Sequence, residues 1–128
     1  MNLGIIDNAT YGILVGTSDT AFSVENFAMG ALIATGNGAG QFAYSAEKTQ
    51  TTAYTGGAKT WKTTRSRIFN NNSGGSITVK EAAIAGYNVG QGQSLLFERS
   101  VLAPTVAVAN GAQLTVTYEI SMDFSAID

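Results

Sequence analysis

The longest regular pattern in the sequence is a strict alternation of apolar and polar residues in the stretch "QLTVTYEISMDF", residues 113–124. Its apolar positions are Leu114, Val116, Tyr118, Ile120, Met122 and Phe124. Successive side chains of a β-strand point to opposite faces, so this alternation predicts a strand with one buried side and one solvent-facing side. Strands of this kind are typical of antiparallel sheets, and the pattern therefore favours an all-β fold.

Shorter alternating or apolar stretches occupy residues 11–15, 41–44, 59–69, 76–87 and 94–102. Turn-forming residues separate them, including "NNNSGG" at 70–75 and the pair Asn110-Gly111. Short strands with regularly spaced turns predict a single antiparallel β-sandwich of about six to eight strands over residues 1–128. At most one short helix is expected, near residues 23–33, where Ser23 could cap its first turn.

The Asn- and Gly-rich run at 70–75 predicts a β-hairpin, because these residues tolerate the backbone conformations of sharp turns. If the hairpin pairs Phe69 with Ile77, Arg65 lies opposite Glu81. Glu81 then sits on an otherwise apolar face, where a carboxylate needs a charged partner. We therefore predict a structural ion pair of Glu81 with Arg65 or Arg67, with a contact to another subunit as the alternative.

Composition argues against an enzyme and against several kinds of ligand. The chain has no His and no Cys, which removes the commonest general base and the strongest metal ligands, and it has no nucleotide-binding motif. We expect no catalytic residues, no metal and no cofactor. Seven scattered basic residues and a net charge of −2 do not suit nucleic acid. No stretch resembles a secretory signal or a membrane span, so no membrane partner is expected.

Charged residues make up only 12% of the chain, against about 25% in typical soluble domains. Either a β-rich domain built on Thr, Ser, Asn and Gly or a surface covered by other subunits would explain this scarcity. The two ends, residues 1–7 and 125–128, are expected to act as assembly arms that reach a neighbouring subunit. Folding back onto their own sandwich is the alternative. Their apolar residues are Leu3, Ile5, Ile6, Phe124 and Ile127.

Three aromatic residues, Tyr44, Tyr54 and Trp61, lie in predicted strand regions. Aromatic residues on strands usually pack in the core or against a cross-strand neighbour. On an exposed concave face, the same rings would instead form a platform for stacking sugars. They therefore leave open a second function, a carbohydrate- or receptor-binding module at a host cell surface.

An ordered series of short motifs resembles small β-sandwich structural proteins of tailed bacteriophage virions. The series comprises Val15-Gly16-Thr17, "NNNSGGSITVKE", "LFER" at 96–99 and "NGAQLTVTY", within residues 11–124. In that family the strand after the Asn-rich turn usually continues with bulkier residues than Ala82-Ala83-Ile84-Ala85. The resemblance implies a non-enzymatic virion component that assembles as a symmetric homo-oligomer with itself and other virion proteins, on the tail, neck, fibre or capsid surface.

Overall fold

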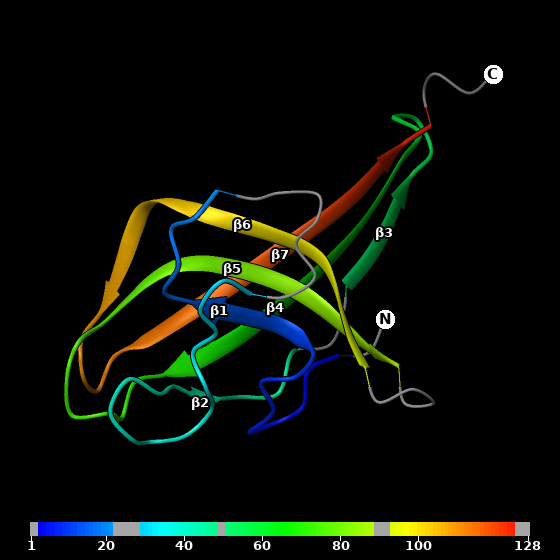
Figure 1. Cartoon of the computed structure of the whole chain (residues 1–128). Coiled ribbons are helices and arrows are strands. Elements are labelled where there is room, and N and C mark those ends of the chain that lie inside the picture. Colours follow the sequence, from blue (N-terminus) through cyan, green and yellow to red (C-terminus); the bar gives the residue numbers. More distant parts are fainter. Residues whose placement is uncertain (1–2, 22–28, 49–50, 89–92, 125–128) are drawn as a thin grey trace.

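The computed structural model describes residues 3–21, 29–48, 51–88 and 93–124, and it confirms the all-β prediction. Seven strands form two antiparallel sheets in a sandwich (Figure 1). No helix occurs among the described residues; the expected helix near 23–33 lies partly outside them, and residues 29–33 form a bend and an isolated bridge. The strands are β1 (Gly12–Gly16), β2 (Ala43–Tyr44), β3 (Thr51–Thr55), β4 (Thr60–Asn70), β5 (Ile77–Asn88), β6 (Gln93–Val108) and β7 (Gln113–Asp123).

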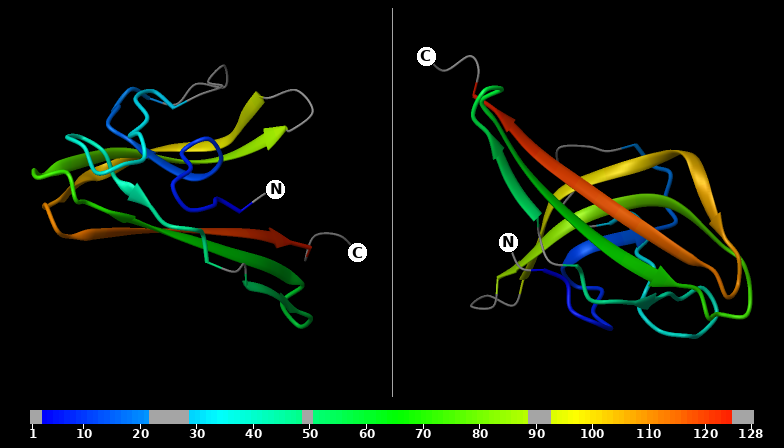
Figure 2. Two further views of the ribbon diagram at one scale, coloured as in Figure 1. Left: turned by 90° about the horizontal axis from the view of Figure 1, so that it is seen from below. Right: turned by 180° about the vertical axis from the view of Figure 1, so that it is seen from behind.

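The first sheet has the order β1-β5-β6, and the second is built around β4. β7 pairs with β4 along its whole length, with Trp61 opposite Met122 and Phe69 opposite Leu114. The other side of β4 pairs with β3 near its start and with β2 at its end. The two sheets appear as layers in Figure 2, with a further segment over the outer side of the first sheet. We call this segment, described at residues 17–21 and 29–33, the covering segment.

The Asn-rich turn does not close a hairpin, so that prediction is wrong. β4 and β5 belong to different sheets, and residues 71–76 carry the chain from one to the other. Asn71 is fully buried, and its side-chain nitrogen donates to the carbonyls of Gly75 and Val108, both at 2.8 Å. The Gly111 backbone N–H in turn donates to the Asn71 carbonyl at 2.7 Å. Asn71 therefore ties together the two turns that cross between the sheets, β4 to β5 and β6 to β7.

The hydrophobic core lies between the sheets at this crossing end. The Tyr44 and Phe69 rings meet edge to face with centroids 4.7 Å apart, a geometry favoured by aromatic pairs. Burying each such side chain contributes roughly 1.5–3 kcal/mol. Other buried members are Ile13, Leu14, Val15, Ile33, Phe42, Ile77, Val79, Ala82, Ile84, Ala85 and Val108.

Tyr44 carries a buried hydroxyl that donates to the Ile33 carbonyl at 2.6 Å. Burial raises the pKa of Tyr44 from 10.0 to about 12. The folded state holds this proton more tightly than the unfolded state, so the stabilisation is complete below pH 10 and is lost as the pH rises toward 12. Between pH 8 and pH 10.5 we expect the wild type to lose about 0.8 kcal/mol of unfolding free energy more than Tyr44→Phe does.

Urea unfolding of both proteins at the two pH values measures this difference. Tyr54→Phe, which changes an exposed ring, serves as the matched control and should follow the wild type. If Tyr44→Phe and the wild type lost the same stability over this interval, the assignment of the effect to the Tyr44 hydroxyl would be wrong.

The pairing of β5 with β6 is irregular between Val79 and Glu81, and this irregularity changes which face Glu81 occupies. Val79 pairs with Val106 and Glu81 with Val101, so the register shifts at this point. A bulge of this kind interrupts the alternation of side chains. Ile77 and Val79 belong to the core between the sheets, whereas Glu81 contacts the segment over the outer face of the first sheet.

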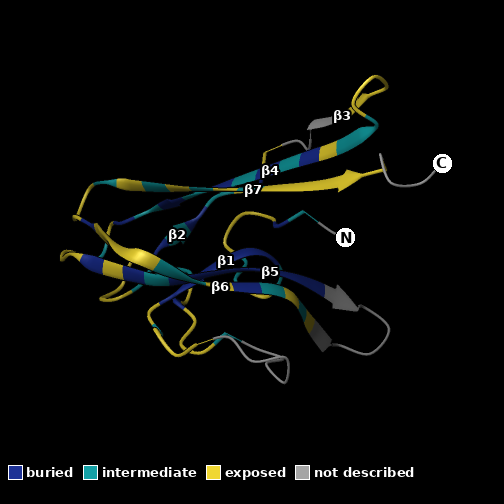
Figure 3. Cartoon of the chain, turned by 90° about the horizontal axis from the view of Figure 1, so that it is seen from above, coloured by how far each residue is buried: buried dark blue, intermediate teal, exposed yellow. Residues whose placement is uncertain are grey.

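The sheets diverge away from the crossing turns (Figure 3). Leu114, Val116 and Tyr118 on β7 pack against the core, but farther along the same face Ile120 and Met122 are exposed. The far ends of β3, β4 and β7 extend beyond the first sheet (Figure 1). The sandwich therefore has a closed end and an open end, and apolar side chains of the inner face are exposed at the open end.

Candidate functional site

Arg67, on the inner face of β4, is fully buried beneath the N-terminal segment. Its guanidinium lies 4.8 Å from the centre of the Tyr44 ring and donates to five backbone carbonyls. Burial lowers the pKa of Arg67, while the negative charge of Glu47 opposes that shift. The carbonyls belong to Ser45 at 2.8 Å, Tyr11 at 3.2 Å, Ile13 at 3.0 Å, Ile5 at 2.6 Å and Asn8 at 2.7 Å.

Glu47 is the acidic counterpart of this arrangement. One carboxylate oxygen accepts from the Ile13 N–H at 2.7 Å, and the other accepts from Arg65 Nη2 at 2.5 Å and from the Gly4 N–H. Arg65 and Glu47 are both buried, so each charge needs the other. Glu47 was not identified from the sequence as a buried partner. The sequence signal was the pair Arg65 and Arg67, since two arginines on one buried strand face need buried acceptor groups.

Residues 3–8 lie on their own sandwich rather than extending as a free arm. Arg67 and Glu47 hold this segment, and the Glu47 N–H also donates to the Gly4 carbonyl at 2.8 Å. Leu3 is partly buried, whereas the Ile5 and Ile6 side chains are exposed. From the sequence, residues 1–7 are expected to reach a neighbouring subunit. Residues 3–8 instead stay on their own sandwich, because buried charged groups bind their backbone. At the other end, the Phe124 N–H donates to the Lys59 carbonyl and continues the β7 pairing, and Ile127 lies outside the described residues.

Glu81 is fully buried, but its partner is Arg99 on β6, and the predicted pairing with Arg65 or Arg67 is wrong. Arg99 Nε lies 2.6 Å from Glu81 Oε2. The Glu81 carboxylate also accepts from the N–H groups of Gly30 at 3.2 Å and Ala31 at 2.7 Å. The register shift before Glu81 places its side chain on the face away from β4. Because Glu81 and Arg99 also bind backbone groups of the covering segment, the pair holds that segment on the first sheet. A charged residue within the apolar run "SLLFERSVL" was the sequence signal for Arg99.

The three aromatic residues occupy different environments. Tyr44 is in the core, Trp61 is partly buried, and Tyr54 is 62% exposed. Tyr54 pairs with Trp61, and Trp61 pairs with Met122 on its other side. Directly opposed residues on neighbouring strands share a face. Tyr54, Trp61 and Met122 therefore form a row on the extended part of the second sheet, which we call the extension row.

The open end of the sandwich exposes large apolar side chains of both sheets. Phe97 on β6 is 58% exposed and Met122 on β7 is 51% exposed, and Ile120 lies between Met122 and the core along β7. An exposed cluster of large apolar side chains is a common feature of protein–protein contact surfaces. We call Phe97, Ile120 and the extension row the open-end surface.

The buried charged groups are engaged in holding backbone segments, which is a structural role. Arg65, Arg67 and Arg99 are all buried, so none presents a cation to a nucleic-acid phosphate. In residues 3–21, 29–48, 51–88 and 93–124, no group of three or more acidic side chains is positioned to hold a metal ion. Within the same described residues, no helix is long and apolar enough to span a bilayer.

Comparison with known proteins identifies no relative of this chain. It matches no protein-family model, no curated protein and no solved structure.

Proposed function

We propose that this chain is a non-enzymatic structural subunit that associates with copies of itself, as a component of a tailed bacteriophage virion. The observation that carries the proposal is the open-end surface, where Phe97, Ile120 and Met122 expose apolar area on an inner sheet face. A specific interface typically buries on the order of 1,600 Å² in total, and large apolar side chains supply much of its central area. The low charge content and the resemblance to virion proteins support the same function.

The contacts of the ionisable groups also support a structural function. Glu47, Glu81, Arg65, Arg67 and Arg99 hold the N-terminal segment and the covering segment in place. Groups committed to backbone and ion-pair contacts inside the fold are not available to a substrate. A subunit of a repeating assembly needs this kind of rigidity, because every copy must present the same surface. Its expected partners are further copies of the chain and other virion proteins.

Introducing a charge on the open-end surface tests the proposal. Met122→Lys places an ammonium group on a side chain that is already 51% exposed, so the isolated chain should tolerate it within about 0.5 kcal/mol. Buried at an interface, the same charge would be unpaired and would strongly oppose association. We expect an oligomeric mass for the wild type and a monomeric mass for Met122→Lys, measured by size-exclusion chromatography with light scattering.

Thr117→Lys is the matched control, because Thr117 is exposed on the same strand but alternates to the opposite face. It should assemble like the wild type. An assembled Met122→Lys protein, with a mass equal to that of the wild type, would remove the open-end surface from the proposal. A wild-type protein that stays monomeric at every concentration would contradict self-association itself.

A second candidate function, binding a glycan or receptor at a host cell surface, is favoured by one observation. Tyr54 exposes most of its ring beside Trp61, and aromatic rings on an exposed sheet face can stack against sugars. In this case the extension row would bind ligand as a monomer. The mass of the wild-type protein therefore separates the two functions, since a monomer favours the second.

A further inference from the structure

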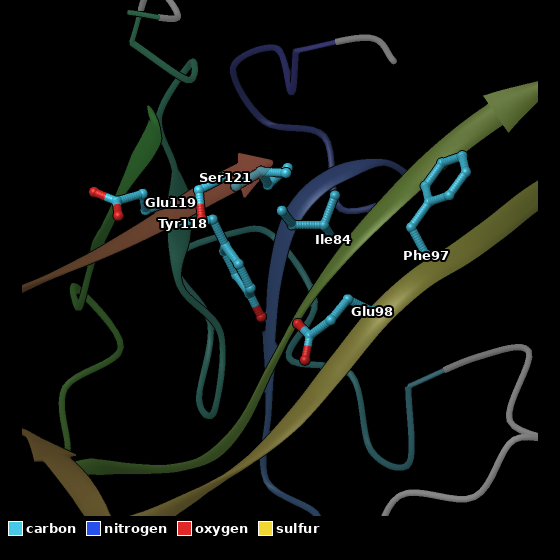
Figure 4. Close-up of a pocket in the computed structure, with 7 residues that line it drawn as sticks. Ile84, Phe97, Glu98, Tyr118, Glu119 and Ser121 are labelled. Atoms are coloured by element: carbon cyan, nitrogen blue, oxygen red, sulfur yellow. The ribbon is translucent and has the colours of Figure 1, made fainter. Parts of the chain in front are cut away.

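A cavity of about 570 Å³ lies between the two sheets where β6 and β7 diverge (Figure 4). Ile84, Phe97 and Ile120 provide its apolar walls, and Glu98 and Tyr118 provide polar groups. The Phe97 ring packs directly against Gly86, at a position where a larger residue would place its Cβ. Gly86 therefore allows Phe97 to form one wall of the cavity without filling it.

Two polar atoms at this cavity make no hydrogen bond of normal geometry among the described residues, although the two groups lie near each other. They are Glu98 Oε2 and the Tyr118 hydroxyl, and both are buried. The other carboxylate oxygen, Glu98 Oε1, accepts from the Ser100 hydroxyl. The Tyr118 ring directs its hydroxyl toward the Glu98 carboxylate (Figure 4). A buried polar atom without a partner is unfavourable, so a ligand that supplied a donor to Glu98 Oε2 would be stabilised.

Glu98 differs from the two fully paired acidic residues of the interior. Glu47 has Arg65 and Glu81 has Arg99, but within the described part of the chain no Lys or Arg forms an ion pair with Glu98. Glu119, which also lines the cavity, pairs with Lys62 at 3.2 Å. The cavity therefore combines apolar walls with one carboxylate whose charge has no cationic partner. A cation is the complementary ligand charge.

We propose that this cavity binds an ammonium or guanidinium group carried on an apolar stem, with Glu98 as the anionic acceptor. The stem would pack between Phe97 and Ile120, and the charged head would donate to Glu98 Oε2. Burial raises the pKa of Tyr118, and the Glu98 carboxylate adds to that shift, so its hydroxyl stays protonated at neutral pH. The ligand is either a free alkylated cation or a Lys or Arg side chain of a neighbouring copy. The site itself does not depend on the proposed assembly.

Butylguanidinium is a suitable probe, with neutral butylurea as its uncharged counterpart. Titration of the full chain, followed by amide chemical shifts, should show saturable binding with a Kd on the order of 1 mM. The shifts should concentrate at the cavity residues, and butylurea should bind at least tenfold more weakly. Glu98→Gln should weaken butylguanidinium binding about tenfold or more, because the neutral amide removes the negative charge that attracts the guanidinium group.

Asp19→Asn is the matched control, since it removes an exposed carboxylate outside the cavity that pairs with Lys80. It should change the Kd less than about twofold. If Glu98→Gln does not fold, the comparison of butylguanidinium with butylurea on the wild type decides the proposal, and equal binding of the two probes would overturn it. Lack of saturable binding, equal binding by Glu98→Gln and the wild type, or shifts confined to another surface would each overturn the proposal.

The source of the cation is identified by the mass of Glu98→Gln under conditions in which the wild type associates. A loss of association, together with weaker butylguanidinium binding, assigns the site to a side chain of a neighbouring copy. Unchanged association with weaker binding assigns it to a free alkylated cation.

Discussion

Arg67→Met is expected to remove most of the stability of this protein. The substitution keeps much of the volume of the side chain but deletes every donor that now satisfies the five carbonyls around Arg67. Each carbonyl left buried without a partner costs about 1–3 kcal/mol where water cannot replace the donor. A loss of at least 3–5 kcal/mol is comparable with the whole stability of a marginal domain, which is about 5–15 kcal/mol. Urea unfolding followed by Trp61 fluorescence measures it.

Two further variants make this test specific. Arg67→Lys keeps the positive charge, but an ammonium group has only three donors and lacks the planar fork of guanidinium, so it should recover only part of the loss. Lys62→Met removes an exposed cation from the same strand, whose surface ion pair with Glu119 should contribute about 1 kcal/mol or less. If Arg67→Met were as stable as Lys62→Met, the carbonyl contacts would not hold the N-terminal segment.

The strands with uninterrupted pairing could be predicted from sequence, and β7 is the clearest case. It pairs with β4 without a register shift over its full length, so the alternation of Leu114, Val116 and Tyr118 is preserved in the structure. The all-β fold follows from patterns of this kind. The exposure of Ile120 and Met122 could not be predicted, since it depends on where the opposite sheet ends, and that is a property of the packing between sheets.

The candidate site was harder to predict, because it depends on long-range partners. The Asn-rich turn has the same local chemistry in a hairpin and in a crossing between sheets, and only the contact of Asn71 with the carbonyl of Val108 distinguishes them. Extrapolating the alternation through Val79 placed Glu81 on the wrong face, since a bulge leaves no clear mark in the sequence. The acceptors of Arg67 are backbone carbonyls, which carry no sequence signal at all.

The first and second sheets thus depend on separate buried charges. Arg67 and Glu47 fasten the N-terminal segment near β4, and Glu81 and Arg99 fasten the covering segment to β5 and β6. In both places charged side chains form hydrogen bonds to the backbone of an irregular segment. Such segments need these partners because their N–H and C=O groups are not paired in a sheet. These contacts fix the irregular segments in one position, so every copy of an assembling subunit would present the same surface.

Glu81 and Arg99 are expected to lose their stabilising effect together. Glu81→Ala leaves Arg99 buried without a counter-charge and leaves the N–H of Ala31 without its acceptor, so a loss of about 3–5 kcal/mol is expected. Arg99→Met should cause a similar loss. Because the two residues form one pair, the double variant should be less destabilised than the sum of the single variants, by about 1–3 kcal/mol.

The matched control cycle pairs Glu81→Ala with Arg65→Met, the partner that the sequence had indicated. Arg65 lies on the other sheet and pairs with Glu47, so these two losses should add within about 0.5 kcal/mol. Unfolding free energies of the single and double variants, measured in urea, separate the two arrangements. A coupling of Glu81 to Arg65 that exceeded its coupling to Arg99 would restore the hairpin and contradict the register shift at Glu81. Coupling to Arg99 alone would establish that Glu81 pairs across the first sheet with β6 and not with β4.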